Sequence, residues 1–163
     1  MACEFTHRDE VRDVYRKRAA HYDFTANLYY LLGFRQWDYR RQAVEALHLR
    51  PGDTVVEIGC GTGLNFGLLR DAVGPSGRIV GVDLTDAMLE QAKERVQGQH
   101  WDNVTLVQSS AAAFDFPPEL DGVISTFALT LEPDYAKVIE HARLALRPGG
   151  RLVVADIRLP PGW

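Results

Sequence analysis

The chain lacks the features that mark membrane-spanning, disulfide-rich and metal-binding proteins. Its 163 residues include only two cysteines, Cys3 and Cys60, and these form neither a disulfide framework nor a zinc motif. No apolar run approaches the roughly 18–20 residues of a membrane-spanning helix. The opening "MACEFTHRDE" also lacks the apolar segment of a secretory signal. We therefore expect a protein of the reducing cytoplasm that carries no metal site.

An excess of positive charge is missing as well. The formal net charge is −4, with nine Lys and Arg against seven Asp and Glu in residues 1–50, and nine against fifteen in the remainder. This balance argues against nucleic acid as a partner. The basic side chains of Arg12, Arg16, Lys17 and Arg18 leave peripheral contact with an anionic membrane surface open. A solvated helix face is the favoured explanation of the same charges.

Strand and helix patterns alternate from Asp53 onward. Apolar and β-branched runs predict strands at 54–58, 78–84, 104–110, 121–129 and 151–157, helical spacing covers 64–73, 87–96 and 135–146, and "RPGG" predicts a turn at 147–150. Strands joined by helical crossovers favour an α/β fold with a doubly wound, mainly parallel sheet. We expect one domain over 1–163, with a helical cap at 1–50, a ligand-binding core at 51–157 and a tail at 158–163.

The stretch "VVEIGCGTGLNF" follows the first strand and places Gly59, Gly61 and Gly63 at every second position. Dinucleotide sites have the spacing G-x-G-x-x-G and hold a pyrophosphate at a helix N-terminus. Here the spacing differs, and the carboxylate of Glu57 would repel a pyrophosphate. An acid suits a ligand with an ammonium and a sulfonium, such as S-adenosylmethionine. Asp83, at the tip of the second strand, is placed to accept from ribose hydroxyls.

Three stretches, "VEIGCGTG", "VGVDLTDAMLEQA" and "LRPGGRLVVAD", resemble in order and spacing the class I S-adenosylmethionine-dependent methyltransferases. The resemblance covers residues 54–157. It implies a Rossmann-like methyltransferase fold that binds S-adenosyl-L-methionine and the product S-adenosyl-L-homocysteine. The cofactor-binding residues that it implies are Tyr22, Glu57, Gly59, Cys60, Gly61, Thr62, Gly63, Asn65, Asp83, Leu84, Met88, Ser110, Ala111, Thr126 and Phe127.

The resemblance assigns parts of the cofactor to different elements of the fold. The glycine loop is expected to hold the methionine part, with Asn65 reaching its carboxylate from the first helical turn. Asp83 is expected to hold the ribose, and Leu84 and Met88 to pack on the adenine. Ser110 stands where many relatives carry an aspartate that accepts from the adenine amino group. A hydroxyl accepts that hydrogen bond more weakly than a carboxylate does.

Two N-terminal stretches narrow the family. "RAAHYD" and "LLGFRQWDYRR" resemble the ubiquinone and menaquinone C-methyltransferases and the bacterial phospholipid N-methyltransferases. The segment 125–152, which begins "STFALTLEPD", is more similar to the second group. We expect methyl transfer to an amphiphilic or small-molecule acceptor in lipid metabolism, and N-methylation of a phospholipid headgroup is favoured. A quinone C-methyltransferase, another small-molecule methyltransferase and a cofactor-binding module without turnover are the alternatives.

No catalytic base can be named from the sequence. His141 falls within an expected helix and is more simply a packing or surface histidine. His21 lies near the expected site, and Tyr22 either covers the cofactor or packs the cap. An amine acceptor needs only a neutral lone pair, whereas a quinol carbon calls for a general base.

The final "RLPPGW" cannot form a sheet strand because it holds two prolines and a glycine. In the resembling family, the fifth strand is followed by a helix and two further strands. We therefore expect strands six and seven to be missing, and the fifth strand to be an edge with an apolar face. Such an edge favours self-association, or indicates a fragment of a longer protein. The expected location is cytoplasmic, with peripheral membrane contact left open.

Overall fold

The computed structural model describes residues 8–19 and 35–157, and every structural statement below concerns these residues. Tyr22 and His21 lie outside them. The elements are α1 (Arg8–Arg18), α3 (Gln36–Ala46), β1 (Thr54–Ile58), α4 (Phe66–Val73), β2 (Arg78–Asp83), α5 (Asp86–Gly98), β3 (Val104–Gln108), β4 (Leu120–Thr126), the 3-10 helix η2 (Leu129–Leu131), α6 (Tyr135–Ala145) and β5 (Leu146–Ala155).

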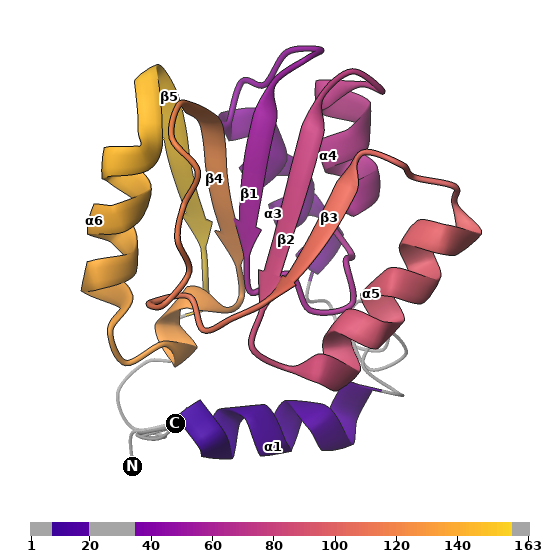
Figure 1. Cartoon of the computed structure of the whole chain (residues 1–163), viewed down its shortest axis with the longest axis vertical. Coiled ribbons are helices and arrows are strands. Elements are labelled where there is room, and N and C mark those ends of the chain that lie inside the picture. The colour runs from indigo at the N-terminus through magenta and orange to yellow at the C-terminus, as the bar shows by residue number, and fades with distance from the viewer. Residues whose placement is uncertain (1–7, 20–34, 158–163) are drawn as a thin grey trace.

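The described strands form one parallel sheet in the order β3-β2-β1-β4-β5. The chain runs outward from β1 to β3 and then returns to the other side of β1 with β4. This reversal creates a crevice beyond the carboxyl ends of β1 and β4, where open α/β sheets bind their ligands. Figure 1 shows all strand arrows pointing toward the end of the sheet at which η2 and α1 lie.

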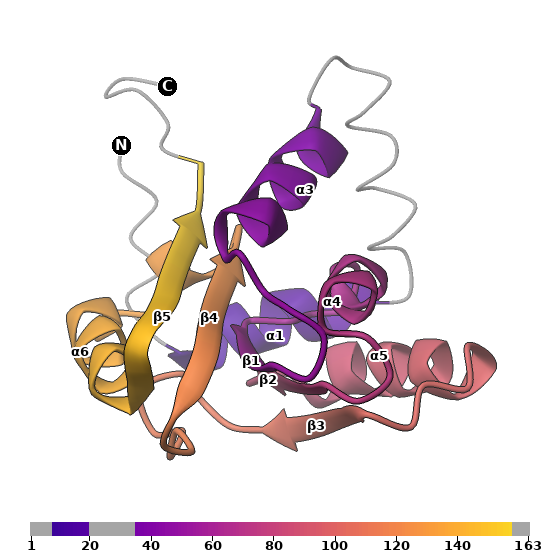
Figure 2. The ribbon, with the colours of Figure 1, turned by 90° about the horizontal axis from the view of Figure 1, so that it is seen from above.

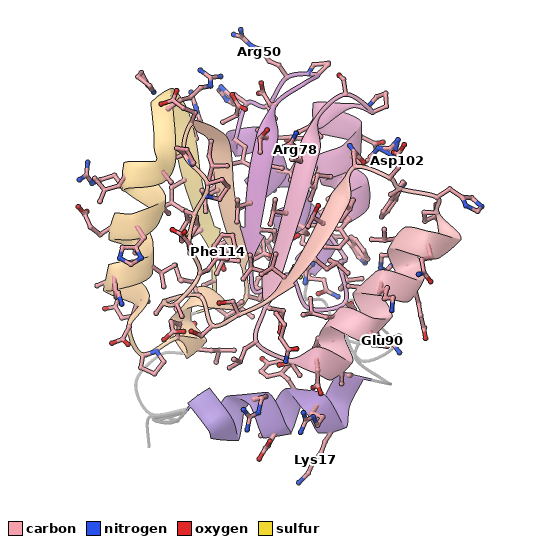
Figure 3. The ribbon with its side chains drawn as sticks, viewed as in Figure 1. Lys17, Arg50, Arg78, Glu90, Asp102 and Phe114 are labelled. Atoms are coloured by element: carbon pink, nitrogen blue, oxygen red, sulfur yellow. The ribbon has the colours of Figure 1, made fainter. Side chains whose placement is uncertain are left out.

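Side chains alternate along each strand and so feed two hydrophobic layers. Val55 and Ile124 pack with α3, α4 and α5 on one face of the sheet. Val56 and Val123 pack with α6 on the other face, together with Phe114 from the segment between β3 and β4 (Figure 3). Seen from above, α3 and α4 lie on one side of the sheet and α6 on the other (Figure 2). Both faces are covered, as the doubly wound prediction requires.

Some boundaries expected from the sequence are wrong: the strand expected at 121–129 ends at Thr126 and is followed by η2, and the strand expected at 104–110 ends at Gln108. The stretch 147–150 was expected as a turn between a helix and a strand, but β5 already begins at Leu146. Leu120 pairs with Leu146 and Gly122 with Arg151, so 147–150 form an irregularity within β5 opposite a single β4 residue. Pairing with β4 on both sides of the glycines keeps this local turn inside the strand.

β5 is an edge strand of the described sheet, as expected. Val154 and Ile157 are among the exposed large apolar side chains, at 42% and 49% exposure. None of the helices in the described part of the chain is long and apolar enough to cross a bilayer.

Candidate functional site

A cavity lies at the carboxyl ends of β1, β2 and β4, where the crevice of the sheet was expected. Its lining combines the glycine loop, the β2 tip, the segment after β3 and the turn after β4. The predicted site residues in its wall are Gly59, Cys60, Gly61, Thr62, Asp83, Leu84, Met88, Ser110, Ala111, Thr126 and Phe127. Residues from five separate segments of the sequence prediction thus meet around one space.

Three predicted residues do not line this cavity. Glu57 and Asn65 are buried, with 1% and 0% of their surface exposed, and they lie behind the loop. Gly63 lies at the start of the turn that leads into α4, where a Cβ would come within 2.5 Å of the Phe66 ring. The fifteenth predicted residue, Tyr22, is outside the described residues.

The glycine loop has a backbone that requires glycine. Gly59, Gly61 and Gly63 have φ angles of 67°, 55° and 78°, in the left-handed region that side chains disfavour. A Cβ on Gly59 would come within 2.3 Å of the Ala128 Cβ. Gly59 therefore allows the loop after β1 to touch the turn after β4, and this contact forms one wall of the cavity.

Asp83 joins the glycine loop to the start of α5. Its Oδ2 accepts from the Gly61 N–H at 2.8 Å, and its Oδ1 accepts from the Thr85 N–H at 2.8 Å. Burial raises the pKa of Asp83, against the lowering effect of these two N–H groups. Each carboxylate oxygen has a second lone pair. The acid therefore holds the loop and still presents acceptors to the cavity.

A buried polar network lies behind the loop. Asn65 Nδ2 donates to Glu57 Oε1 at 2.7 Å and to Thr126 Oγ1 at 2.9 Å. Arg40 Nη1 donates to Asn65 Oδ1 at 3.0 Å and to Thr126 Oγ1 at 2.8 Å, and its guanidinium lies 5.1 Å from the centre of the Phe127 ring. The network connects α3, β1, the α4 N-terminus and the end of β4.

Burial dominates the electrostatics of this network. It raises the pKa of Glu57 to about 8, although the Arg40 charge and the Asn65 hydrogen bond both lower it. Glu57 Oε2 has no hydrogen-bond partner among the described residues. Burial is also the main cause that raises the pKa of the Cys60 thiol, and the carboxyl groups of Asp83 and Glu57 raise it further. Cys60 is therefore a neutral thiol in the loop and is not suited to act as a nucleophile.

Arg40 is a charged residue of the cavity wall that sequence reasoning missed. Only 5% of its surface is exposed, and it contributes to the cavity wall. The signal was present in the helical spacing: Gln36, Arg40, Ala43 and Val44 form the buried side of α3. An arginine in phase with the buried positions of a helix needs buried partners, which here are supplied by elements distant in sequence.

The first helix completes the cavity from outside. Tyr15 of α1 is part of its lining. Arg16 makes a two-pronged ion pair with Asp86 at the start of α5, with Nε–Oδ1 and Nη2–Oδ2 distances of 3.0 and 2.7 Å. Figure 1 shows α1 crossing the end of the sheet beside α5. The N-terminal segment is thereby fixed to the core at the mouth of the cavity.

The remaining chemistry of the cavity wall is sparse. Ser110 Oγ accepts from the Ala113 N–H at 3.3 Å and so caps its own turn. No histidine is among the residues that line the cavity in the described part of the chain, and His141 lies on α6 away from it. Within the described ranges, His, Cys, Asp and Glu form no group that could hold a metal ion.

A model of the ubiE/COQ5 methyltransferase family matches residues 4–160 of the chain. The chain belongs to this family. The family and the Rossmann-like fold expected from the sequence are thereby confirmed, and the family and the structural neighbours are methyltransferases.

Curated relatives agree with this membership. The chain is 29% identical over 161 residues to a demethylmenaquinone methyltransferase of Listeria welshimeri, covering 97% of this chain and 67% of that one. It is 36% identical over 129 residues to an uncharacterized 37.1 kDa protein in a transposon of Streptomyces fradiae, covering 77% of this chain and 35% of the other. The chain therefore spans about one third to two thirds of these relatives' length.

Solved structures show the same architecture. A methyltransferase of Haloferax volcanii, in complex with the Trm112 methyltransferase activator, superposes with a TM-score of 0.76 at 26% identity, covering 90% of this chain and 60% of that one. A phosphoethanolamine N-methyltransferase of Haemonchus contortus, with phosphomonomethylethanolamine and S-adenosylhomocysteine, gives 0.66 at 26% identity over 72% of this chain and 28% of that one.

The residues present fit this cofactor. Asp83 offers carboxylate oxygens at the β2 tip, and behind the loop Glu57 has a buried oxygen that no described residue contacts by a hydrogen bond. The close approach of the Gly59 loop to Ala128 leaves no room for a bulkier residue at the first glycine. These features suit a ligand with a ribose at one end and an amino acid at the other.

Proposed function

We propose that this chain binds S-adenosylmethionine in the described cavity and transfers its methyl group to a small amphiphilic acceptor. The observation that carries the proposal is the convergence of the glycine loop, Asp83 and the Thr126–Phe127 turn around one cavity at the switch point of the sheet. The cofactor supplies the electrophilic methyl group. The protein needs to position the acceptor for in-line displacement and to exclude water.

The residues have separate roles in this proposal. Asp83 accepts hydrogen bonds from the ribose, and Leu84 and Met88 pack on the adenine. Gly59 and Gly61 let the loop approach the ligand closely. We also propose that the described helices and sheet form one domain, with α1 and α3 as its N-terminal cap; the contacts of Arg16 and Arg40 with the core support this.

The first candidate acceptor is the ring carbon of a demethylated isoprenoid quinol. Its support is the demethylmenaquinone methyltransferase whose sequence aligns with 97% of this chain. The ubiE/COQ5 family match over residues 4–160 agrees with it. This acceptor requires a general base, which has to come from outside the described cavity wall or from a quinol that is already ionised.

The second candidate is the amine of a phospholipid or phosphoethanolamine headgroup, which the sequence patterns favoured. Two observations support it. Glu132 adds a carboxylate to the cavity lining, and a carboxylate attracts a cationic headgroup. The lining in the described part of the chain also lacks a histidine base, which an amine does not need. The Haemonchus N-methyltransferase, which binds such a headgroup, shares the fold.

The deciding experiment is an acceptor panel with labelled S-adenosylmethionine. The whole chain is incubated with a short-chain demethylmenaquinol in detergent micelles, with phosphatidylethanolamine vesicles and with phosphoethanolamine. Label in the quinol supports the first acceptor, and label in either amine supports the second. Calorimetric binding of S-adenosylhomocysteine is measured in parallel. Binding without labelled product on any acceptor would favour a cofactor-binding module, and absence of binding would overturn the proposal.

Two further interactions are part of the proposal. Lys17 is exposed on α1 and points away from the sheet (Figure 3), so it is available to an anionic membrane surface. Arg16 is engaged by Asp86. Self-association through the β5 edge is the other proposal, and exposed Val154 and Ile157 support it. Vesicle co-sedimentation and analytical ultracentrifugation test the two separately.

A further inference from the structure

Four N–H groups of the glycine loop are already engaged within the protein. The Gly59 and Cys60 N–H groups both donate to the Val82 carbonyl, at 2.8 and 3.0 Å. The Gly61 N–H donates to Asp83 Oδ2 at 2.8 Å, and the Gly63 N–H to the Cys60 carbonyl at 2.9 Å. A ligand carboxylate would therefore have to break existing bonds to use these four donors.

The other expected partner of the cofactor carboxylate is engaged as well. Asn65 is fully buried, and its amide nitrogen donates to Glu57 and Thr126. Its amide oxygen accepts from Arg40. The side chain lies behind the cavity wall and holds the network together. These expected partners of the cofactor carboxylate among the described residues are thus already bonded within the protein.

Arg40 is a cation in the wall at this end of the cavity. It contacts Thr126 and lies over the ring of Phe127, both in the turn after β4. A guanidinium carries five N–H donors in a planar fork that matches a carboxylate. Arg40 and Glu57 are both buried. Asn65 accepts a hydrogen bond from Arg40 and donates one to Glu57. A buried cation in the cavity wall thus lies beside a buried carboxyl group behind the wall, with Asn65 between them.

We propose that Arg40 binds the carboxylate at the methionine end of the cofactor. This inference rests on the proposed function, because it assumes that S-adenosylmethionine occupies the cavity. Arg40 then serves as a specificity residue: it selects ligands with an intact amino acid over nucleosides that lack the carboxylate. Its position on α3 makes the N-terminal cap part of the cofactor site.

The main rival is a purely structural role. Arg40 supports Asn65 and Thr126, and its removal leaves the buried Asn65 oxygen without this donor, which is destabilising in itself. A loss of affinity in an Arg40 variant therefore decides nothing alone. If Arg40 binds the ligand carboxylate, its replacement should weaken only the binding of ligands that have this carboxylate. If its role is structural, the affinity should fall equally for ligands with and without it. Measuring both ligands against both proteins, as in a double-mutant cycle, separates the two roles.

The experiment measures by calorimetry the binding of S-adenosylhomocysteine and of its decarboxylated analogue, which keeps the amine. The proteins are the wild-type chain, Arg40→Met, Arg40→Lys and the matched control Arg41→Met. Arg41 is the exposed neighbour of Arg40 on α3 and does not line the cavity. Thermal unfolding with and without ligand shows which variants are folded.

The wild type should bind S-adenosylhomocysteine about 10- to 100-fold more tightly than the analogue, the range of a charge-assisted hydrogen bond. Arg40→Met should lose that preference and bind the analogue as the wild type does. Arg40→Lys should keep part of the preference, and Arg41→Met all of it. Equal losses for both ligands in Arg40→Met, or a wild type without preference, would overturn the proposal.

Where Arg40→Met does not fold, the wild-type preference and its reduction in Arg40→Lys decide the question. A wild type that binds the two ligands equally well leaves the proposed function standing and refutes only the role of Arg40. A wild type that binds neither ligand refutes the proposed function and this inference together.

Discussion

Replacing Glu57 with glutamine should make the empty protein more stable at neutral pH. Glu57 is 1% exposed, and burial raises its pKa from 4.5 to about 8. A carboxyl whose pKa is higher in the folded state contributes most to stability below its unfolded-state pKa. That contribution is lost as the pH rises from there toward the folded-state value. Between these two pKa values the folded chain binds a proton that the unfolded chain has released.

The size of the effect follows from the difference between the two pKa values. At about 1.4 kcal/mol per pKa unit, the wild type should lose roughly 2–3 kcal/mol of unfolding free energy between about pH 5 and about pH 7 through this group. Glu57→Gln keeps an oxygen that can accept from Asn65 and removes the ionisation. Its unfolding free energy should therefore lack this fall, and it should exceed that of the wild type increasingly as the pH rises.

Urea denaturation followed by tryptophan fluorescence across this pH range measures the difference. Glu90→Gln is the control, because it removes a carboxylate from an exposed position on α5 (Figure 3) and should leave the pH dependence of the wild type unchanged. Parallel pH profiles for wild type and Glu57→Gln would refute the reasoning, since they would mean that Glu57 is ionised at no cost in the folded chain.

Three further outcomes are expected. Asp83→Ala should weaken S-adenosylhomocysteine binding by about 1.5–3 kcal/mol in calorimetry; unchanged affinity would remove the ribose assignment. Gly59→Ala should cost about 2–5 kcal/mol of stability because of its φ of 67° and a Cβ 2.3 Å from that of Ala128. Gly61→Ala, whose added Cβ has no described atom within 4 Å, should cost only about 1–2 kcal/mol of stability. Equal losses of stability in the two variants would contradict the close contact between Gly59 and Ala128. Ser110→Asp should tighten binding of S-adenosylhomocysteine by about 3- to 10-fold if an adenine amino group lies there, and no change would count against that placement.

The parts of the fold that were predictable depend on short-range rules. The run at 54–58 is rich in β-branched residues and is followed by a glycine, and β1 has these bounds. The glycines of the loop adopt the backbone angles that only glycine takes without strain, so their pattern was informative before any contact was known. Asp83 was predicted as a ligand-binding residue because it ends a parallel strand, and the carboxyl ends of parallel strands meet at the ligand-binding edge of the sheet.

The parts that were not predictable depend on contacts between distant segments. Helical spacing separates Arg40 from its exposed neighbour Arg41, but the partners of the buried arginine, Asn65 and Thr126, come from distant segments that the spacing does not identify. The 147–150 stretch carries a strong local turn signal, yet pairing with β4 keeps it inside β5. In both cases the deciding partner lies more than twenty residues away along the chain.

The buried carboxyl group of Glu57 and the buried guanidinium of Arg40 lie close together, and their burial bears on function. Asn65 donates to Glu57 and accepts from Arg40, and burial raises the pKa of Glu57 to about 8. A ligand with an ammonium near Glu57 and a carboxylate near Arg40 would favour the charged form of both side chains, whereas the pyrophosphate of a dinucleotide would oppose the ionisation of Glu57. The stability that the empty protein forgoes is then recovered with the zwitterionic ligand bound. The pH dependence expected for the empty protein and the proposed selectivity of the site thus rest on neighbouring buried residues.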